Sequence, residues 1–228
     1  MADFKKGPYT PRPYVKNVLD DRKLRLTAPP TGGAIRPHEL QVSLYNSNPG
    51  LTVFTNIDND KNKGVIRAGM DAQAFYFFLE RIIAVADHQG EVTEIIDNKE
   101  KIKDESTGKN VMQTASRTVI GKGKDGKVFI SVLSPDNERP KIKFTFGQHY
   151  YHPVVRKEGT PLSDAEVSVA MARGWVRLMR NLVAPTMVHA YVAPTPQAQG
   201  GGGSGNSYQQ KAAPAKDDSA FDFDDLPM

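Results

Sequence analysis

Lysine, arginine and aromatic residues recur at alternate positions in several short segments of this 228-residue chain. Lys127 and Phe129 share one face of an alternating segment, and Lys141 and Lys143 share one face of another. Cationic side chains neutralise phosphates, and an exposed aromatic ring stacks on a nucleobase with a contribution of about 1–3 kcal/mol. The pattern therefore predicts a surface that binds a polyanion. Phe129 is the strongest candidate for stacking, because solubility does not explain an aromatic residue on a cationic face.

Other segments extend this set of candidate contacts. The stretch Gly121-Lys122-Gly123-Lys124 places two cations on a backbone that can approach a phosphate closely. For each cation the alternative is a solvent-exposed charge that serves only solubility. Phe54 is ambiguous for another reason, because a register shift of one residue would bury it. The expected nucleic-acid contacts are Lys23, Arg25, Tyr45, Phe54, Arg67, Lys122, Lys124, Lys127, Phe129, Lys141 and Lys143.

The sequence contains no recognisable catalytic motif. His149 and His152 lie close together, but no nearby acid completes a set of metal ligands. The phosphate-binding loop and the serine-nucleophile motif are both missing. We therefore expect no enzymatic activity, no cofactor and no metal. A nuclease-type DNA-processing subunit stays open as an alternative, because acids that are distant in sequence can converge in a fold.

Two series of short alternating segments, each followed by a helical pattern, must position these residues. The first series predicts strands near residues 23–27, 40–45, 51–57 and 64–69, and the second near 92–96, 114–121, 127–133 and 141–147. Turns are expected at Asn48-Pro49-Gly50 and, as a two-residue hairpin turn, at Asp125-Gly126.

Helical spacing of apolar residues follows each series. One helix is expected over 71–87 with Asp71 as its N-cap, and one over 164–183 opened by a capping box of Ser163 and Glu166. Residues 187–192 are compatible with a short closing strand.

The predicted fold class is α+β, with two units that each combine an antiparallel four-stranded sheet and a helix. The units form a pseudo-repeat over 21–90 and 91–193 within one binding domain, 21–193. This order of elements resembles the Whirly and transcriptional-coactivator type of single-stranded DNA binder, which implies packed helices and two curved sheets. The alternative is an OB-fold barrel with added hairpins and a C-terminal helix.

Composition divides the rest of the chain. Residues 1–20 read as an extended, proline-punctuated arm, and residues 194–216 as a flexible linker rich in Gly, Gln, Ala, Pro and Ser. Residues 217–228 form an acidic tip. The net charge is +4, but the two Lys and five Asp from Lys211 onward contribute −3, which leaves +7 for the preceding part. A basic body with an acidic tail is typical of a polyanion binder.

The tip interleaves acids and apolar residues in a specific order. Asp222, Phe223, Asp224, Asp225, Leu226 and Pro227 follow one another directly. A purely solvating tail has no use for such apolar anchors, so we expect these six residues to bind a partner.

Together with the linker and the basic body, this tip resembles the single-stranded-DNA-binding (SSB) proteins of bacteria and their phages. One acid fewer is present, and Met228 stands where that family ends in Phe. The resemblance implies a sequence-nonspecific single-stranded DNA-binding protein of DNA replication, recombination and repair. Its tip would recruit a polymerase, helicase or nuclease. The body does not match the bacterial body, which favours a phage or otherwise divergent version. A protein-interaction adaptor is the alternative.

Cysteine is absent, which removes disulfides and fits a reducing compartment. No segment approaches the roughly 18 apolar residues of a membrane span. We therefore expect a cytoplasmic protein, in the host cytoplasm if phage-encoded, without a membrane partner. Both a monomer and a homodimer remain open.

Overall fold

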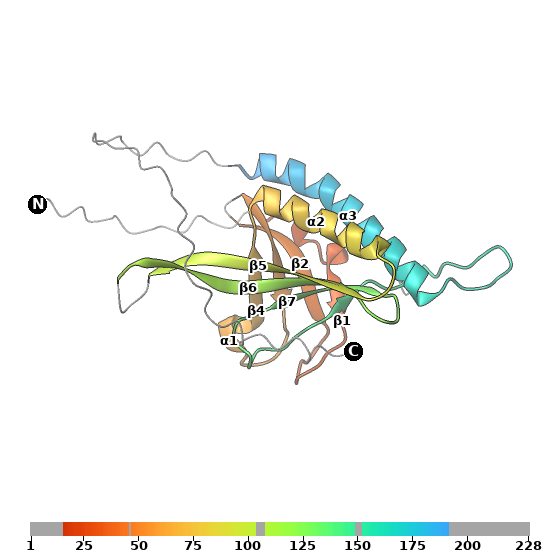
Figure 1. Ribbon diagram of the computed structural model, residues 1–228, viewed down its shortest axis with the longest axis horizontal. Helices are drawn as coiled ribbons and strands as arrows, with labels where there is room; N and C mark the ends of the chain where they lie inside the picture. Colours follow the sequence, from red (N-terminus) through yellow and green to blue (C-terminus); the bar gives the residue numbers. More distant parts are fainter. Residues whose placement is uncertain (1–15, 46, 104–107, 149–151, 192–228) are drawn as a thin grey trace, which may run out of the picture.

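The computed structural model describes residues 16–45, 47–103, 108–148 and 152–191. Four strands and a helix are followed by four further strands and a second helix (Figure 1). The elements in chain order are η1 (Val18–Asp20), η2 (Arg22–Leu24), β1 (Leu26–Ala28), β2 (His38–Tyr45), β3 (Asn48–Phe54), α1 (Lys61–Gly64), β4 (Val65–Gly69), α2 (Ala72–Asp87), β5 (Val92–Lys103), β6 (Asn110–Lys122), β7 (Val128–Leu133), β8 (Phe144–Thr145) and α3 (Asp164–His189).

The strands form two antiparallel sheets of four, in the orders β1-β2-β3-β4 and β5-β6-β7-β8. The predicted α+β class and the repeated order of strands and helix are therefore confirmed. No ladder of hydrogen bonds joins the two sheets among the described residues, so they do not close into the barrel that was the alternative.

The two long helices begin where their capping residues predict. The Asp71 carboxylate accepts a hydrogen bond from the Ala74 amide at 2.7 Å, and Ser163 and Glu166 form the reciprocal capping box of α3. The expected closing strand over 187–192 is wrong, because α3 continues through Pro185 to His189. Val183 and Thr186 on either side of the proline are buried, and this packing outweighs the one backbone hydrogen bond that proline removes.

The first predicted turn is misplaced. Asn48, Pro49 and Gly50 lie within β3, where Pro49 pairs with Leu44. The reversal comes just before them, and Ser47 adopts a left-handed φ of 65° there. A proline-containing strand start had the composition of a turn, which misled the prediction.

The second predicted turn is confirmed as a hairpin, but its loop is longer. The Gly123 amide donates to the Lys127 carbonyl at 3.0 Å, which leaves residues 124–126 in the loop. Gly126 has a φ of 75°, as expected for a three-residue hairpin loop that ends in a left-handed glycine.

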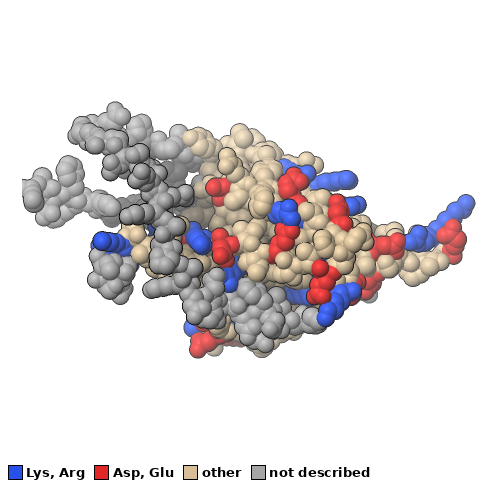
Figure 2. Space-filling view, viewed as in Figure 1, with Lys and Arg blue, Asp and Glu red and all other residues tan. Residues whose placement is uncertain are grey.

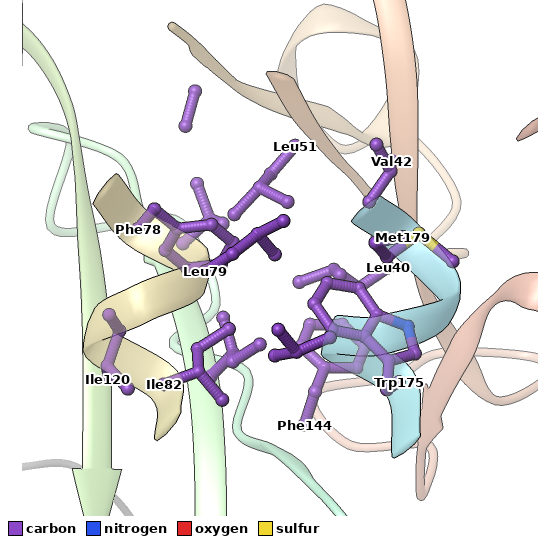
Figure 3. Close-up of a cluster of buried hydrophobic side chains, with 14 of the residues drawn as sticks. Leu40, Val42, Leu51, Phe78, Leu79, Ile82, Ile120, Phe144, Trp175 and Met179 are labelled. Atoms are coloured by element: carbon purple, nitrogen blue, oxygen red, sulfur yellow. The ribbon is translucent and has the colours of Figure 1, made fainter. Parts of the chain in front are cut away.

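One hydrophobic core serves both units. Figure 3 shows Phe78, Leu79 and Ile82 of α2 packed toward side chains from both sheets and from α3, where Trp175 and Met179 contribute. Neither unit therefore buries its apolar face alone, and the pseudo-repeat forms a single domain.

The N-terminal arm ends earlier than residue 20. Asn17 and Asp20 cap the short helix η1, and Leu19 between them is only 1% exposed within the core. Residues 17–20 thus belong to the body. None of the helices in the described ranges combines the length and the apolar character needed to cross a membrane.

Candidate nucleic-acid interface

The first sheet has one face on the core and one turned away from it, which we call the outer face. Leu40, Val42, Leu51, Val53 and Ile66 point to the core, so the alternate residues of these strands point outward. Cross-strand pairing sets them in rows across β2, β3 and β4, namely Gln41, Thr52 and Arg67, and then Ser43, Gly50 and Gly69.

A depression of about 600 Å³ opens over these rows. Its lining consists of Ser43, Tyr45, Asn48, Pro49, Gly50, Leu51, Thr52, Arg67, Ala68, Gly69, Met70 and Asp71. We call it the Tyr45 groove, because Tyr45 is 66% exposed at its edge. The paired glycines Gly50 and Gly69 leave the floor without side chains, so a flat ligand can approach the backbone closely.

The polar groups of the Tyr45 groove complement its aromatic edge. Arg67 is exposed, and the hydroxyls of Ser43 and Thr52 are hydrogen-bonded to each other at 2.8 Å. The one acid in the lining, Asp71, is held at the positive N-terminus of α2 by the Ala74 amide. The groove therefore combines a ring for stacking, a guanidinium for a phosphate and a bare floor.

Arg67 also lines a second depression, of about 500 Å³. This Lys63 depression is bounded by Asn62, Lys63, Val65, Ile66, Arg67, Ala115, Ser134 and Arg139. All of its charged lining residues are basic. Lys63 is presented by an unusual turn, because Asn62, Lys63 and Gly64 all have left-handed φ values of 53°, 56° and 71°. Such backbone strain is concentrated at functional sites in proteins.

Two of the predicted contacts, Tyr45 and Arg67, thus share the Tyr45 groove. Two others, Arg25 and Phe54, lie on the same outer face but contact each other. The Arg25 guanidinium lies 4.9 Å from the centre of the Phe54 ring and also pairs with Glu39. These half-buried side chains form a supporting cluster beside the groove. Lys23 is exposed on η2, before β1.

The prediction that Phe129 is exposed is wrong. Its side chain does point to the face opposite the core, as its alternation with Val128 and Ile130 requires, but it is only 5% exposed. A Cβ on Gly121 would overlap the Phe129 ring, so the glycine makes room for the ring to lie on the backbone. Lys143 lies over the ring at 4.2 Å from its centre. Phe129 thus packs with Val119 and Leu133 and does not offer a stacking face.

The hairpin lysines have structural partners. Lys122 donates to the carbonyls of Ala86 and His88 at 3.1 and 2.8 Å, at the C-terminus of α2. Lys127 pairs with Asp164 at 2.8 Å, which raises the pKa of the lysine. Lys124 is exposed in the loop, and Lys141 is half-buried before β8.

The hairpin is also remote from the Tyr45 groove. Asp71 lies at the groove and caps the start of α2, whereas Lys122 binds its end, and the 16 residues of α2 at 1.5 Å per residue separate them by about 24 Å. The predicted contacts therefore do not form one continuous set.

Replacing Lys122 by Ala is expected to lower stability and leave nucleic-acid affinity unchanged. Loss of a cation at the carbonyl end of α2 costs about 1 kcal/mol or less, which thermal unfolding detects. Lys124→Ala, in the exposed loop two residues away, is the matched control and should alter neither property. A fall in affinity without a change in unfolding temperature would indicate that Lys122 contacts the nucleic acid.

Sequence reasoning missed several residues of the candidate interface. Ser43, Gly50, Thr52, Lys63 and Gly69 were not predicted as contacts. The detectable signal was the pair of glycines in adjacent strands, since a glycine inside a strand often marks a close approach of ligand to backbone. The predicted partner-binding residues Asp222, Phe223, Asp224, Asp225, Leu226 and Pro227 lie outside the described residues.

The helices offer a surface of mixed sign. Figure 2 shows Lys, Arg, Asp and Glu interspersed on the visible face of the body. Arg173 pairs with Asp87 and Arg180 with Glu80, which ties α3 to α2. A polyanion gains little net attraction there. Within the described ranges, no group of three or more His, Asp or Glu residues is arranged to hold a metal ion.

Comparison of the chain with protein-family models, with curated proteins and with solved structures finds no match in any of the three. The functional interpretation therefore depends on the Tyr45 groove, the Lys63 depression and the sequence itself.

Proposed function

We propose that this protein binds single-stranded DNA without base specificity, through the Tyr45 groove and the Lys63 depression. One observation carries the proposal: Arg67 lines both, and so connects the groove edged by Tyr45 to a hollow whose charged lining residues are all basic. Tyr45 stacks on an unpaired base, which lies against the glycine floor. Arg67 and Lys63 bind the phosphates that follow it.

This arrangement favours a single strand of any sequence. Every base has a π-face, so stacking on Tyr45 does not discriminate strongly among bases. Bases of a duplex are already stacked on their neighbours and offer the ring no free face. The acidic tip supports a role in DNA replication, recombination and repair, in which the protein coats single strands in the cytoplasm and recruits a polymerase, helicase or nuclease.

Binding of labelled oligo-dT and of the corresponding duplex, compared across salt concentrations and with or without Mg²⁺, tests the proposal. Affinity for oligo-dT should exceed that for duplex and fall with salt by about 0.7 units of log K per log salt for each phosphate neutralised. A flat salt response or a preference for duplex would contradict the proposal. Mg²⁺-dependent cleavage of the oligonucleotide would instead indicate a nuclease.

Replacing Gly69 by Val is expected to weaken binding without destabilising the fold. A Cβ at Gly69 meets no atom within 4 Å, and valine favours strands, so unfolding temperature should hold or rise. The new side chain would stand on the groove floor, and loss of one stacking contact of about 1.4 kcal/mol lowers affinity about tenfold. Gly147→Val, where a Cβ also meets no atom within 4 Å, is the matched control. Unaltered affinity of the Gly69 variant would exclude the floor as the path of the strand.

Deleting Asp217 to Met228 is expected to raise affinity for oligo-dT severalfold at low salt. The tip carries five Asp, and a tethered acidic segment competes with DNA for basic surfaces at high effective concentration. The gain should vanish as salt screens the charges. Binding of replication or recombination proteins, measured by co-purification, should be lost with the same deletion. Lower DNA affinity would indicate that the tip contributes to the DNA site.

A further inference from the structure

The β5–β6 hairpin forms an arm that extends beyond the body. β5 and β6 stay paired to Lys103 and Asn110, and Figure 1 shows this end of the hairpin projecting past the other described strands. From Lys99 onward most of the described arm residues are exposed. Such an outer end buries little apolar surface and so contributes little to the stability of the domain.

The arm begins next to the Lys63 depression. Asn98 pairs with Ser116 and Lys99 pairs with Thr114, so Ala115 is an extra residue in β6. Bulges of this kind bend a strand and increase its local twist. Ala115 itself lines the Lys63 depression, so the bulge joins the arm directly to this depression.

One face of the arm is basic. Side chains alternate along a strand, so Lys99, Lys101 and Lys103 share a face, and their cross-strand partners are Thr114, Met112 and Asn110. Glu100 is the one acid between Lys99 and Lys103, and it lies on the opposite face of the strand. The structure records no ion pair between these three lysines and any described residue. Their successive spacing is about 6.7 Å, from two residues at about 3.3–3.4 Å each.

We propose that the β5–β6 arm is a second DNA contact, in which Lys99, Lys101 and Lys103 bind the phosphates of a single strand that leaves the Lys63 depression. This inference rests on the proposed function. A second copy of the chain is the less suitable occupant of this face. If the two arms met, identical rows of lysines would repel each other, and if the arm met another surface of the copy, the lysine charges would be left unmatched. Stacking is not required of the arm, and its contribution is electrostatic.

The triple variant K99A/K101A/K103A tests the arm with two lengths of oligo-dT. One, of about six nucleotides, is near the short end of known single-strand site sizes, and the other has about thirty. On the long oligonucleotide we expect affinity near 0.1 M salt to fall by about tenfold or more, and the salt slope to fall by about two, which is three phosphates at about 0.7 each. On the short one, affinity should stay within about twofold of the unaltered protein.

A variant with the same charge loss elsewhere, Lys124→Ala/Lys157→Ala/Arg177→Ala, controls for net charge, because all three side chains are exposed. If the arm variant binds the long oligonucleotide as the control does, the inference is overturned and the proposed function stands. An equal loss on both lengths also overturns it, because the lysines would then belong to the groove site. If the unaltered protein binds neither length, the proposed function fails and the arm contact fails with it.

Discussion

Replacing Tyr45 by Ala is expected to reduce affinity for oligo-dT by about tenfold to a hundredfold. Removal of one base-stacking contact costs about 1–3 kcal/mol, and each 1.4 kcal/mol is a factor of ten. Tyr45 is 66% exposed at the end of β2, so its ring contributes little to the core. Unfolding temperature should therefore stay within the error of the measurement. Fluorescence anisotropy with labelled oligo-dT measures the effect.

Tyr45→Phe separates the ring from the hydroxyl. The phenylalanine variant keeps the stacking face and should bind nearly as well as the unaltered protein. If both variants lose affinity alike, the hydroxyl makes the contact and the stacking model is incorrect. If neither loses affinity, the strand does not pass over Tyr45.

Arg67 distinguishes the groove from a simple stacking pocket. Because Arg67 lines both hollows, we expect its guanidinium to hold the phosphate between a stacked base and the next nucleotide. A basic surface without Tyr45 would bind any polyanion, and an aromatic groove without cations would bind weakly. In the proposed mode of binding, their contact through one residue would give affinity for a nucleic acid without dependence on its sequence.

The sequence predicted the order of the elements because both of its main signals are local. Alternation identified the strands, and Asp71 and Ser163 marked the starts of the helices by capping chemistry. The errors came where packing between distant segments outweighs local preference. Pro185 does not end α3, because Val183 and Thr186 are buried there.

The candidate site was only partly predictable for the same reason. Alternation correctly placed Phe129 opposite the core, but it could not show that Gly121 leaves room for the ring to lie flat or that Lys143 covers it. Lys122 was predicted as a phosphate contact. Its hydrogen bond to a carbonyl at the end of α2 could not be predicted, because it depends on the tertiary fold. Tyr45 and Arg67 lie on one face of the sheet, and this placement was predictable because both are on strands whose alternation is unambiguous.

A buried ion pair lies beside the Lys63 depression, and one of its members, Arg139, lines it. Arg139 contacts Asp60 at 2.7 Å and the Val65 carbonyl at 2.8 Å, and Thr55 donates to the same carboxylate at 2.6 Å. The two charged side chains are only 4% and 8% exposed. They connect the turn before β4 in the first unit to the loop after β7 in the second.

Replacing Arg139 by Ala is expected to destabilise the protein by about 3–5 kcal/mol, because it leaves the Asp60 carboxylate buried without its partner. Urea unfolding near pH 7 measures the loss. Lys61→Ala is the matched control, since it breaks the pairs with Asp136 and Glu138 between the same two loops, but at the exposed surface. Little change is expected there. A similar loss in both variants would mean that burial of the Asp60–Arg139 pair is unimportant.

The pH dependence of this pair provides an independent check. Burial alone would raise the pKa of Asp60, but hydrogen bonds from Arg139 and Thr55 and the charge of Arg139 lower it below its ordinary value of 3.8. A carboxyl group with a lowered pKa in the folded state stabilises the fold above its unfolded pKa, and this contribution disappears as pH falls through the lowered value. The stability difference between the unaltered protein and Arg139→Ala should therefore be largest near neutral pH and shrink below about pH 4. In the variant, protonation of Asp60 relieves an unpaired buried charge, so acid should destabilise it less steeply than it does the unaltered protein. A difference that is constant from pH 7 to pH 3 would show that Arg139 stabilises the fold through packing and its bond to the Val65 carbonyl, with no contribution from the charge of Asp60.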